Sequence, residues 1–417
     1  MRITYLHQYF NTPDMAGGSR SFELGRRLVE MGHEVNMITS WREDQGPGGE
    51  TGWFETNAAG IQVHWLPVAY SNRMSPARRM RSFARFASAA ARRARKLQAD
   101  VVFATSTPLT IALPAIAATR GPRTPMVFEV RDLWPTVPIA LGYLRNPLLR
   151  AAAKQLETLA YRSAAQVVAL APGMAEHVQS VSPATPVTVI PNGCDLELMG
   201  GVSDSERKAF IERYPWLDRL DGALLVYTGT IGDVNDVGYG IELVRALTDR
   251  GIAVSLAIIG DGKRLGEVQS LAEDTGLLGH RIHFIGRVPK REVAIWLEAS
   301  SAGMVTYKGP EIVYRDSVAN KFFDVLAAGR PVLANYKGFA SIVARDHGAG
   351  LILPQDPNEA ASTAAQVLLS KEKLTAMGNA ARKVAEEQFD RRDQARALES
   401  VLSAAHNANG NSRKTRS

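Results

Sequence analysis

The sequence predicts an α/β protein with two domains, each built on a parallel β-sheet. The first half alternates short apolar runs with helical stretches, and the same alternation starts again after residue 190. Strands that alternate with helices form parallel sheets with helices on both faces. At 417 residues the chain is also too long for one ordinary core, so two domains are expected.

In the first half, apolar runs of strand length are bounded by turn residues. They cover residues 3–6, 34–39, 61–66, 101–104, 126–130, 167–170 and 187–190. After the first run, Gly17 and Gly18 precede an amphipathic helix that ends at Gly32. Glycines let a backbone approach a ligand closely, and a helix start offers free N–H groups. The same pattern also fits a plain turn into a helix.

The second half repeats this order of elements. Its predicted strands cover residues 223–228, 254–259, 281–285 and 303–306, and its helices include 239–250 and 290–299. The sequence Pro191-Asn192-Gly193 is a turn signal and marks the domain boundary near residue 190. A final helix is expected over 391–405. The basic, polar residues 407–417 are expected to be disordered.

Composition limits the classes of function. The formal net charge of +7 favours anionic partners. A single cysteine, Cys194, excludes an intrachain disulfide and fits a reducing compartment. The first residues lack the layout of a signal peptide, and no apolar run is long enough to span a bilayer. The histidines have no metal-ligand spacing. We therefore expect a cytoplasmic protein without a metal or other cofactor.

The segment 316–331 is the most informative one. It reads as a loop carrying Asp316, a short helix carrying Lys321 and Asp324, a stop at Gly329 and Pro331, and then a strand that includes Val332 and Leu333. A loop–helix junction offers free N–H groups and a positive dipole end, which suit a phosphate. A carboxylate on the helix can accept hydrogen bonds from a sugar or ribose diol. Taken alone, the two carboxylates fit solvated helix-end charges equally well.

A second cluster of charges lies where the strand 126–130 ends. Glu129, Arg131 and Asp132 occupy this position, and ligands of open α/β sheets bind at the carboxyl ends of strands. Three charges there favour a binding role over core packing. Arg131 suits an anionic group and Asp132 a sugar hydroxyl. The alternative is an Arg–Asp pair that braces the loop.

The segment 73–96 carries nine basic residues and no acidic one. Several apolar residues follow one helical stripe, so the segment predicts a basic amphipathic helix that contacts an anionic membrane surface. The expected contact residues are Arg78, Arg79, Arg81, Phe83, Arg85, Phe86, Arg92 and Arg93. The alternatives are a helix that covers the first sheet with a solvated basic face, or nucleic-acid binding. No nucleic-acid signature accompanies the helix, so no nucleic-acid partner is expected.

Together these motifs resemble a known family. The glycine loop, helix and Gly-His-Glu-Val step of residues 17–35, the Pro-Asn-Gly turn and the segment 316–333 resemble the retaining GT-B glycosyltransferases of family 4. The resemblance covers nearly the whole chain. It is closest to the branch that adds amino or deoxyamino sugars during surface polysaccharide assembly. Both glutamates of the family's E-x7-E signature are aspartates in this sequence.

The resemblance implies a GT-B fold, in which two Rossmann-like domains face a central cleft. Residues 1–190 would form the acceptor domain and 191–390 the nucleotide-sugar domain, with the helix 391–405 packing back on the first. Such an enzyme moves a sugar from a nucleoside diphosphate to a hydroxyl of a lipid-linked saccharide. The resemblance to the family alone favours UDP as that nucleotide. The enzyme retains anomeric configuration by front-face attack and needs no metal. Peripheral association with the inner face of the cell membrane is expected.

The resemblance also assigns residue roles. Asp324 takes the position that binds the donor ribose, and Asp316 the position near the donor sugar. Relatives hold the diphosphate with an arginine and a lysine after the strand 223–228, where this chain has Gly229 and Thr230. The missing charge is therefore expected from Lys321 and Arg287. Arg131 replaces a histidine that faces the donor sugar in many relatives.

Two other classes of function remain open from the sequence. One is a nucleotide-sugar epimerase or a phosphorylase on the same architecture, although no lysine has the sequence context that would hold pyridoxal. The other is a non-catalytic α/β protein that binds nucleic acid or membranes. Binding of a nucleoside diphosphate separates the enzyme from this last class.

Overall fold

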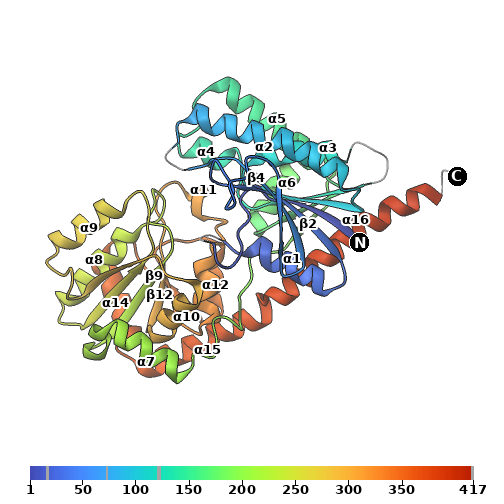
Figure 1. The fold of residues 1–417 in the computed structure, drawn as a ribbon. Helices are drawn as coiled ribbons and strands as arrows, with labels where there is room; N and C mark the ends of the chain where they lie inside the picture. Colours follow the sequence, from blue (N-terminus) through green and yellow to red (C-terminus); the bar gives the residue numbers. More distant parts are fainter. Residues whose placement is uncertain (16–17, 72–73, 120–123, 415–417) are drawn as a thin grey trace. The chain divides into compact units, whose positions relative to one another are not determined.

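The computed structural model describes residues 1–15, 18–71, 74–119 and 124–414 (Figure 1). The chain divides into two compact units. The first comprises Met1–Pro191 and Arg392–Ser417, and the second Asn192–Arg391. Each unit contains one sheet covered by helices (Figure 1). The prediction of two parallel-sheet α/β domains is confirmed.

The sheet of the first unit has eight strands in the order β3-β4-β2-β1-β5-β6-β7-β8. These strands are β1 (Arg2–Leu6), β2 (Glu34–Trp41), β3 (Phe54–Ala58), β4 (Ile61–Pro67), β5 (Val101–Thr105), β6 (Met126–Val130), β7 (Gln166–Ala169) and β8 (Val187–Val189). Ile3 on the central strand β1 is in register with Val35 and with Val101. Only the edge strand β3 runs antiparallel, to β4. The sequence did not predict β3, because its residues are mostly polar and exposed.

Helices cover this sheet and complete its core. They are α1 (Arg20–Glu30), α2 (Pro76–Lys96), η1 (Leu109–Ile111), α3 (Ala112–Ala118), α4 (Thr136–Ala140), α5 (Pro147–Ser163), α6 (Pro172–Val181) and α16 (Arg391–Lys414). Leu398 and Leu402 of α16 are fully buried in the same core as Ile3 and Leu28. The last helix of the chain therefore packs on the first unit.

The expectation of a disordered tail over 407–417 is wrong for the residues that the structure describes. Helix α16 continues to Lys414. Ala405 is buried against the first unit, and His406 Nδ1 lies 3.3 Å from the carbonyl oxygen of Asp100. Extending an anchored helix costs much less than nucleating one, so the polar residues that follow continue it.

The sheet of the second unit has six parallel strands in the order β11-β10-β9-β12-β13-β14. They are β9 (Ala223–Thr228), β10 (Val254–Ile259), β11 (Ile282–Gly286), β12 (Ala302–Val305), β13 (Val332–Ala334) and β14 (Gly350–Ile352). The helices are α7 (Asp204–Arg213), η2 (Pro215–Arg219), α8 (Val237–Thr248), α9 (Leu265–Asp274), α10 (Lys290–Ala299), α11 (Glu311–Tyr314), α12 (Asn320–Ala327), α13 (Phe339–Asp346), α14 (Pro357–Leu368) and α15 (Lys371–Gln388). Because all six strands are parallel, their carboxyl ends lie along one edge of the sheet.

Helix α12 lies unusually close to strand β12. A Cβ atom at Gly303 would come within 2.2 Å of a side-chain carbon of Val325, so only glycine fits at this point of the strand. The buried face of α12 includes Phe322, Phe323 and Leu326. This packing fixes the start of α12, which carries the predicted site residues, at the carboxyl edge of the sheet.

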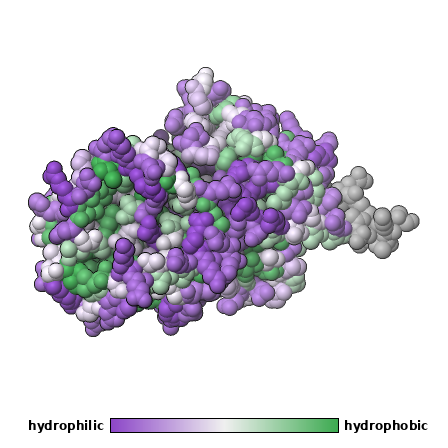
Figure 2. Space-filling model, turned by 90° about the horizontal axis from the view of Figure 1, so that it is seen from below, coloured by the Kyte–Doolittle hydropathy of each residue, from purple (hydrophilic) through white to green (hydrophobic). Residues whose placement is uncertain are grey.

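Most of the apolar side chains predicted to be internal are buried, and the surface is largely polar. On the face drawn in Figure 2, hydrophilic residues dominate and hydrophobic ones form small separate patches. Some large apolar side chains are exposed all the same. Leu148 of α5 is 78% exposed, Tyr143 65% and Leu369 70%.

Candidate functional site

The loops that follow β9 and β10 meet at the carboxyl edge of the second sheet. The N–H of Gly229 donates a hydrogen bond to the carbonyl oxygen of Ile259 at 2.9 Å. A Cβ atom at Gly260 would come within 1.9 Å of the Gly229 oxygen, and Gly229 has a φ of +128°. Both positions therefore require glycine. The contact leaves Gly229 and Thr230 exposed at the sheet edge.

Lys321, in the first turn of α12, points toward this glycine loop. Its side chain is buried, and its Nζ lies 3.7 Å from where a Cβ of Gly229 would be. Nζ donates a hydrogen bond to the Tyr227 hydroxyl at 2.8 Å and lies 4.2 Å from the centre of that ring. The Tyr307 ring centre is 5.5 Å away. Among the described residues, no carboxylate forms an ion pair with it.

Burial without a carboxylate partner disfavours the charged form of this lysine. It lowers the pKa of Lys321 from 10.5 to about 7. Placing a cation here costs free energy in the free protein, and an anionic ligand would recover it. The two aromatic neighbours, Tyr227 and Tyr307, were not predicted from the sequence, because nothing in their spacing links them to α12.

Asp324 lies one turn further along α12 and is also buried. It forms an ion pair with Lys290, the first residue of α10. Sequence reasoning missed Lys290, which is 34 positions away along the chain. The ion pair joins the carboxylate on α12 to a cation on α10, and Lys290 is 36% exposed.

Asp316 is paired with its neighbour in the sequence. Arg315 Nε and Nη2 donate to Asp316 Oδ2 at 3.0 and 2.8 Å. The carboxylate is buried, whereas the Arg315 side chain is 47% exposed. Next to it, the Ser317 hydroxyl donates to the Tyr307 hydroxyl at 2.7 Å. The contact of Asp316 with a donor sugar remains a prediction.

Arg287 follows strand β11 at the same edge of the sheet. Its Nη2 lies 3.2 Å from Asp261 Oδ2, in the loop after β10, and its side chain is 68% exposed. The second unit therefore brings together Gly229, Thr230, Arg287, Lys321 and Asp324 at the carboxyl edge of one sheet.

In the first unit, Arg131 and Asp132 follow strand β6. The N–H of Arg131 donates to the Ser106 hydroxyl at 3.0 Å, and its Nη1 lies 3.3 Å from His7 Nε2. Asp132 accepts a hydrogen bond from Thr107 at 3.3 Å. Ser106 and Thr107 thus hold this loop. The charge of Arg131 also acts on Asp132, so an Arg–Asp pair that braces the loop stays an alternative to the binding role.

His7 was not predicted as a site residue. It lies at the end of β1 and is 4% exposed. Burial, reinforced by the charges of Arg131 and Arg42, holds the pKa of His7 well below its usual value. The imidazole is therefore neutral, and its Nε2 accepts a hydrogen bond from the permanently charged Arg131.

Glu129 does not belong to this polar edge, and its expected binding role is wrong. Its side chain is fully buried and forms an ion pair with Arg20 of α1 at 2.8 Å. Arg20 also donates to the carbonyl oxygens of Ile190 and Pro191, at 3.0 and 2.6 Å. The sequence could not separate Glu129 from its charged neighbours, because its partner is 109 positions away.

The glycine loop before α1 is only partly described. Gly17 lies outside the described residues. The same holds for Arg73, the first residue of the basic segment 73–96. The carbonyl oxygen of Gly18 accepts a hydrogen bond from Asn11 Nδ2 at 3.4 Å. A ligand-binding role for Gly17 and Gly18 remains a prediction.

Part of the expected membrane contact on α2 is wrong. Phe83 and Phe86 are 7% and 1% exposed, because the apolar stripe of α2 packs into the first unit and against α3. Arg93 forms an ion pair with Glu55 and contacts His64. Four of the other predicted contact residues are exposed: Arg78, Arg81, Arg85 and Arg92. Arg79 is half-buried, with its guanidinium carbon 5.9 Å from the centre of the Tyr70 ring.

The described residues contain neither a metal-binding cluster nor a helix that could span a membrane. Within them, no group of three or more histidine, cysteine, aspartate or glutamate side chains is arranged to hold a metal ion. Over the same residues, every helix is too short or too polar to cross a bilayer.

Solved structures with this fold are numerous, and several match almost the entire chain. Sucrose-phosphate synthase from Thermosynechococcus elongatus superimposes with a TM-score of 0.76 at 17% identity, covering 98% of this chain and 99% of that one. HepE from Anabaena, in complex with UDP and glucose, gives 0.70 at 17% identity, covering 97% and 100%. WaaG, a glycosyltransferase involved in lipopolysaccharide biosynthesis, gives 0.65 at 16% identity, covering 96% and 99%. The two units therefore define a GT-B fold.

Family models identify the chain more closely than these distant structures do. Residues 17–193 match the glycosyl transferase 4-like domain, and residues 222–370 match the glycosyl transferases group 1 domain. A comparison with curated protein sequences finds no match. The chain belongs to the group 1 glycosyltransferases of the GT-B type.

Proposed function

We propose that this glycosyltransferase takes its sugar from a nucleoside diphosphate, UDP in the first instance, and binds that donor at the carboxyl edge of the second sheet. The observation that carries the proposal is Lys321, a buried cation without a carboxylate partner that faces the exposed glycine loop at Gly229. A diphosphate supplies the missing negative charge. The HepE structures with UDP and with UDP-glucose support this choice of donor.

In this proposal each site residue has a distinct role. Lys321 and the N–H groups of Gly229 and Thr230 bind the diphosphate, with Arg287 at the rim. Asp324, oriented by Lys290, accepts hydrogen bonds from the ribose hydroxyls, and Asp316 lies near the donor sugar. Stabilising the charge that develops on the leaving diphosphate is the main catalytic task, and fixed cations and backbone N–H groups perform it without a metal.

Arg131 and Asp132 of the first unit are proposed to bind the sugar groups that react. Arg131 offers a charged donor oriented by His7, and Asp132 offers an acceptor for a hydroxyl. We propose that the reaction retains anomeric configuration, with the leaving phosphate accepting the proton of the attacking hydroxyl. This step needs no separate carboxylate base.

A panel of nucleotide sugars tests the proposed function. The purified chain is expected to release the nucleoside diphosphate from at least one donor, and release should accelerate when a lipid-linked saccharide is added. NMR of the product should show the same anomeric configuration as the donor. An epimerase would instead change the donor sugar without releasing the nucleotide.

The low pKa of Lys321 gives a pH prediction. In the ligand-free protein Lys321 loses its proton above about pH 7. A bound diphosphate favours the charged form of Lys321 and raises its pKa. Donor binding at pH 8 should therefore take up close to one proton, and affinity should fall by about tenfold per pH unit above 7. Isothermal titration of UDP-glucose in buffers of different ionisation enthalpy measures both. Binding without proton uptake at pH 8 would contradict this role for Lys321.

We also propose that the acceptor is a lipid-linked saccharide of a surface polysaccharide and that the first unit binds an anionic membrane. Support comes from the exposed face of α2, where Arg81 and Arg85 lie, and from exposed leucines on α5. Leu148 and Leu149 of α5 are 78% and 49% exposed. Helix α3 contacts both α2 and α5, so the three helices form one layer. Leucines replace the buried phenylalanines as the apolar part of this surface.

Flotation with vesicles checks this surface. The protein is expected to float with vesicles containing anionic lipid and to dissociate at high salt. Substituting both Leu148→Ser and Leu149→Ser should lower partitioning at least about tenfold, because each leucine loses its burial in the bilayer. Leu369→Ser, at an equally exposed leucine of the second unit, is the control. Absent or salt-insensitive binding would remove the membrane from the proposal.

A further inference from the structure

A cavity lies at the opposite edge of the second sheet from the donor site. It has a volume of about 580 Å³. Ser300 and Ser301, just before β12, and Arg330, just before β13, line it. Because the strands are parallel, these residues mark the amino edge of the sheet. Helices α10 and α12 begin at the donor site and end at this cavity, where Glu298 and Ala327 line it.

Positive charge dominates the lining of the cavity. Its charged residues are four cations and one carboxylate: Arg207, Arg330, Lys371, Arg382 and Glu298. Arg207 binds Glu298, and Arg382 binds Glu386 of its own helix. Within the described chain, Arg330 and Lys371 form no ion pair. Glu298 is the one carboxylate of the lining, and its charge acts on Arg330 as well as on Arg207. The lining therefore keeps an excess of positive charge.

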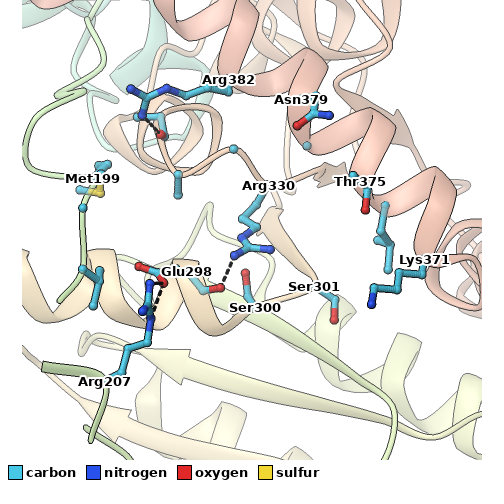
Figure 3. Close-up of a pocket in the computed structure, with 18 residues that line it drawn as sticks. Met199, Arg207, Glu298, Ser300, Ser301, Arg330, Lys371, Thr375, Asn379 and Arg382 are labelled. Carbon is cyan, nitrogen blue, oxygen red and sulfur yellow. Dashed lines mark hydrogen bonds and ion pairs between the residues drawn. The ribbon is translucent and has the colours of Figure 1, made fainter. Parts of the chain in front are cut away.

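Arg330 carries one donor group without a partner in the described part of the chain. Arg330 donates to the carbonyl oxygen of Glu298, at the end of α10, but its buried Nε has no hydrogen-bond partner among the described residues. Figure 3 shows Arg330 near the centre of the view with Ser300 beside it, and Lys371 on α15 to the right, with Ser301 between Arg330 and Lys371.

The wall formed by α15 adds groups suited to a sugar or other polyol. Lys371, Thr375 and Asn379 are spaced four residues apart and lie along one side of the helix (Figure 3). Their amine, hydroxyl and amide groups all end at the cavity. Its volume lies within the range of about 300–1,000 Å³ that small-molecule sites occupy.

We propose that this cavity is a binding site for a small phosphate-bearing molecule, separate from the donor site. The phosphate lies between Arg330 and Lys371, the two lining cations for which no ion pair is found among the described residues. Thr375 and Asn379 bind the hydroxyl groups of a phosphorylated sugar, whereas inorganic phosphate uses the cations alone. The proposal does not depend on the donor role of Lys321, since the two sites share no residue.

Titrations with inorganic phosphate, pyrophosphate and glucose 1-phosphate test this site, with glucose as the uncharged control. Wild-type protein is expected to bind at least one of the three phosphates and not glucose. Tighter binding of glucose 1-phosphate than of inorganic phosphate assigns a sugar phosphate, and the reverse order assigns the free anion. Lys371→Glu is expected to weaken binding at least about tenfold, because an ammonium that contacts the phosphate becomes a carboxylate.

Matched variants locate the bound anion. Lys373→Glu changes the same charge in the same turn of α15 without lining the cavity, and it should bind like the wild type. Lys321→Met, in the donor site, should also retain binding. Arg330→Gln should weaken binding in protein whose thermal unfolding shows that it is folded. Binding that survives Lys371→Glu but is lost in Lys321→Met, or no binding of any phosphate, would overturn the proposal.

Discussion

Lys321→Met is expected to remove most of the transferase activity while leaving the fold at least as stable. The substitution keeps the length and apolar stem of the side chain and deletes the buried ammonium, with its hydrogen bond to the Tyr227 hydroxyl. Loss of one preorganised group that stabilises charge in a transition state lowers the rate by about 10²–10³-fold. The kcat/KM of the nucleotide-sugar reaction measures this effect.

The stability part of this prediction has a defined pH dependence. Because burial lowers the pKa of Lys321 to about 7 from 10.5, folding carries the full cost of the charge below pH 7. Between pH 7 and the usual lysine pKa, the folded protein releases a proton that the unfolded chain keeps, so wild-type stability rises with pH. The gain from Lys321→Met should therefore be largest below pH 7 and shrink above it.

A matched control uses an exposed lysine of the same unit. Lys383 is 71% exposed on α15, so Lys383→Met should change neither kcat/KM nor the pH dependence of stability appreciably. Wild-type kcat/KM in Lys321→Met would refute the role of this lysine. A large loss of stability in Lys321→Met would refute the claim that the buried charge of Lys321 destabilises the folded protein.

Glu129→Ala is expected to cause the largest loss of stability of any substitution considered. Burial alone would raise the pKa of Glu129. The charges of Arg20 and Arg131, with hydrogen bonds from Arg20 and Thr105, outweigh burial and hold this pKa below its usual value. The alanine variant leaves the buried Arg20 guanidinium without its carboxylate. Breaking one side of a buried pair costs about 3–5 kcal/mol. Urea unfolding of the full chain measures this cost.

The double variant Arg20→Met, Glu129→Leu distinguishes the loss of the ion pair from the cost of leaving one charge buried without its partner. Replacing both charges with apolar groups should restore much of the stability, because no uncompensated charge remains. Glu386→Ala, at a partly exposed pair with Arg382, should cost less than about 1 kcal/mol. If Glu129→Ala costs no more than Glu386→Ala, the buried pair is not a structural element of the first unit.

Local sequence patterns predicted most of the sheet strands and the start of α12, because both depend on nearby residues. Apolar runs of strand length lie in the interior, and Gly329 and Pro331 follow the end of α12. Strand β3 was missed because it is mostly polar and exposed. Strand β14 was missed because it begins with a glycine and has only two apolar residues. The helical continuation beyond residue 405 depends on packing that a polar tail does not reveal.

The sequence predicted only part of the candidate site, because some of its residues meet only in the folded chain. Lys321 and Asp324 lie close together in the sequence, so spacing found them. Their partners Tyr227 and Lys290 lie on other elements and meet them only in the fold. On α2 the apolar stripe was recognised, but periodicity cannot tell whether such a stripe faces a membrane or the protein's own core. Burial of Phe83 and Phe86 decides for the core.

The central claim is that a nucleoside diphosphate binds at Lys321 and Asp324, and calorimetric titration of the full chain tests it most directly. UDP, GDP, ADP and dTDP are titrated into wild-type protein and into Lys321→Met and Asp324→Ala. We expect saturable one-to-one binding of at least one nucleotide, UDP first, weakened at least about tenfold in each variant. The absence of binding for all four nucleotides, or wild-type affinity in both variants, would contradict the account.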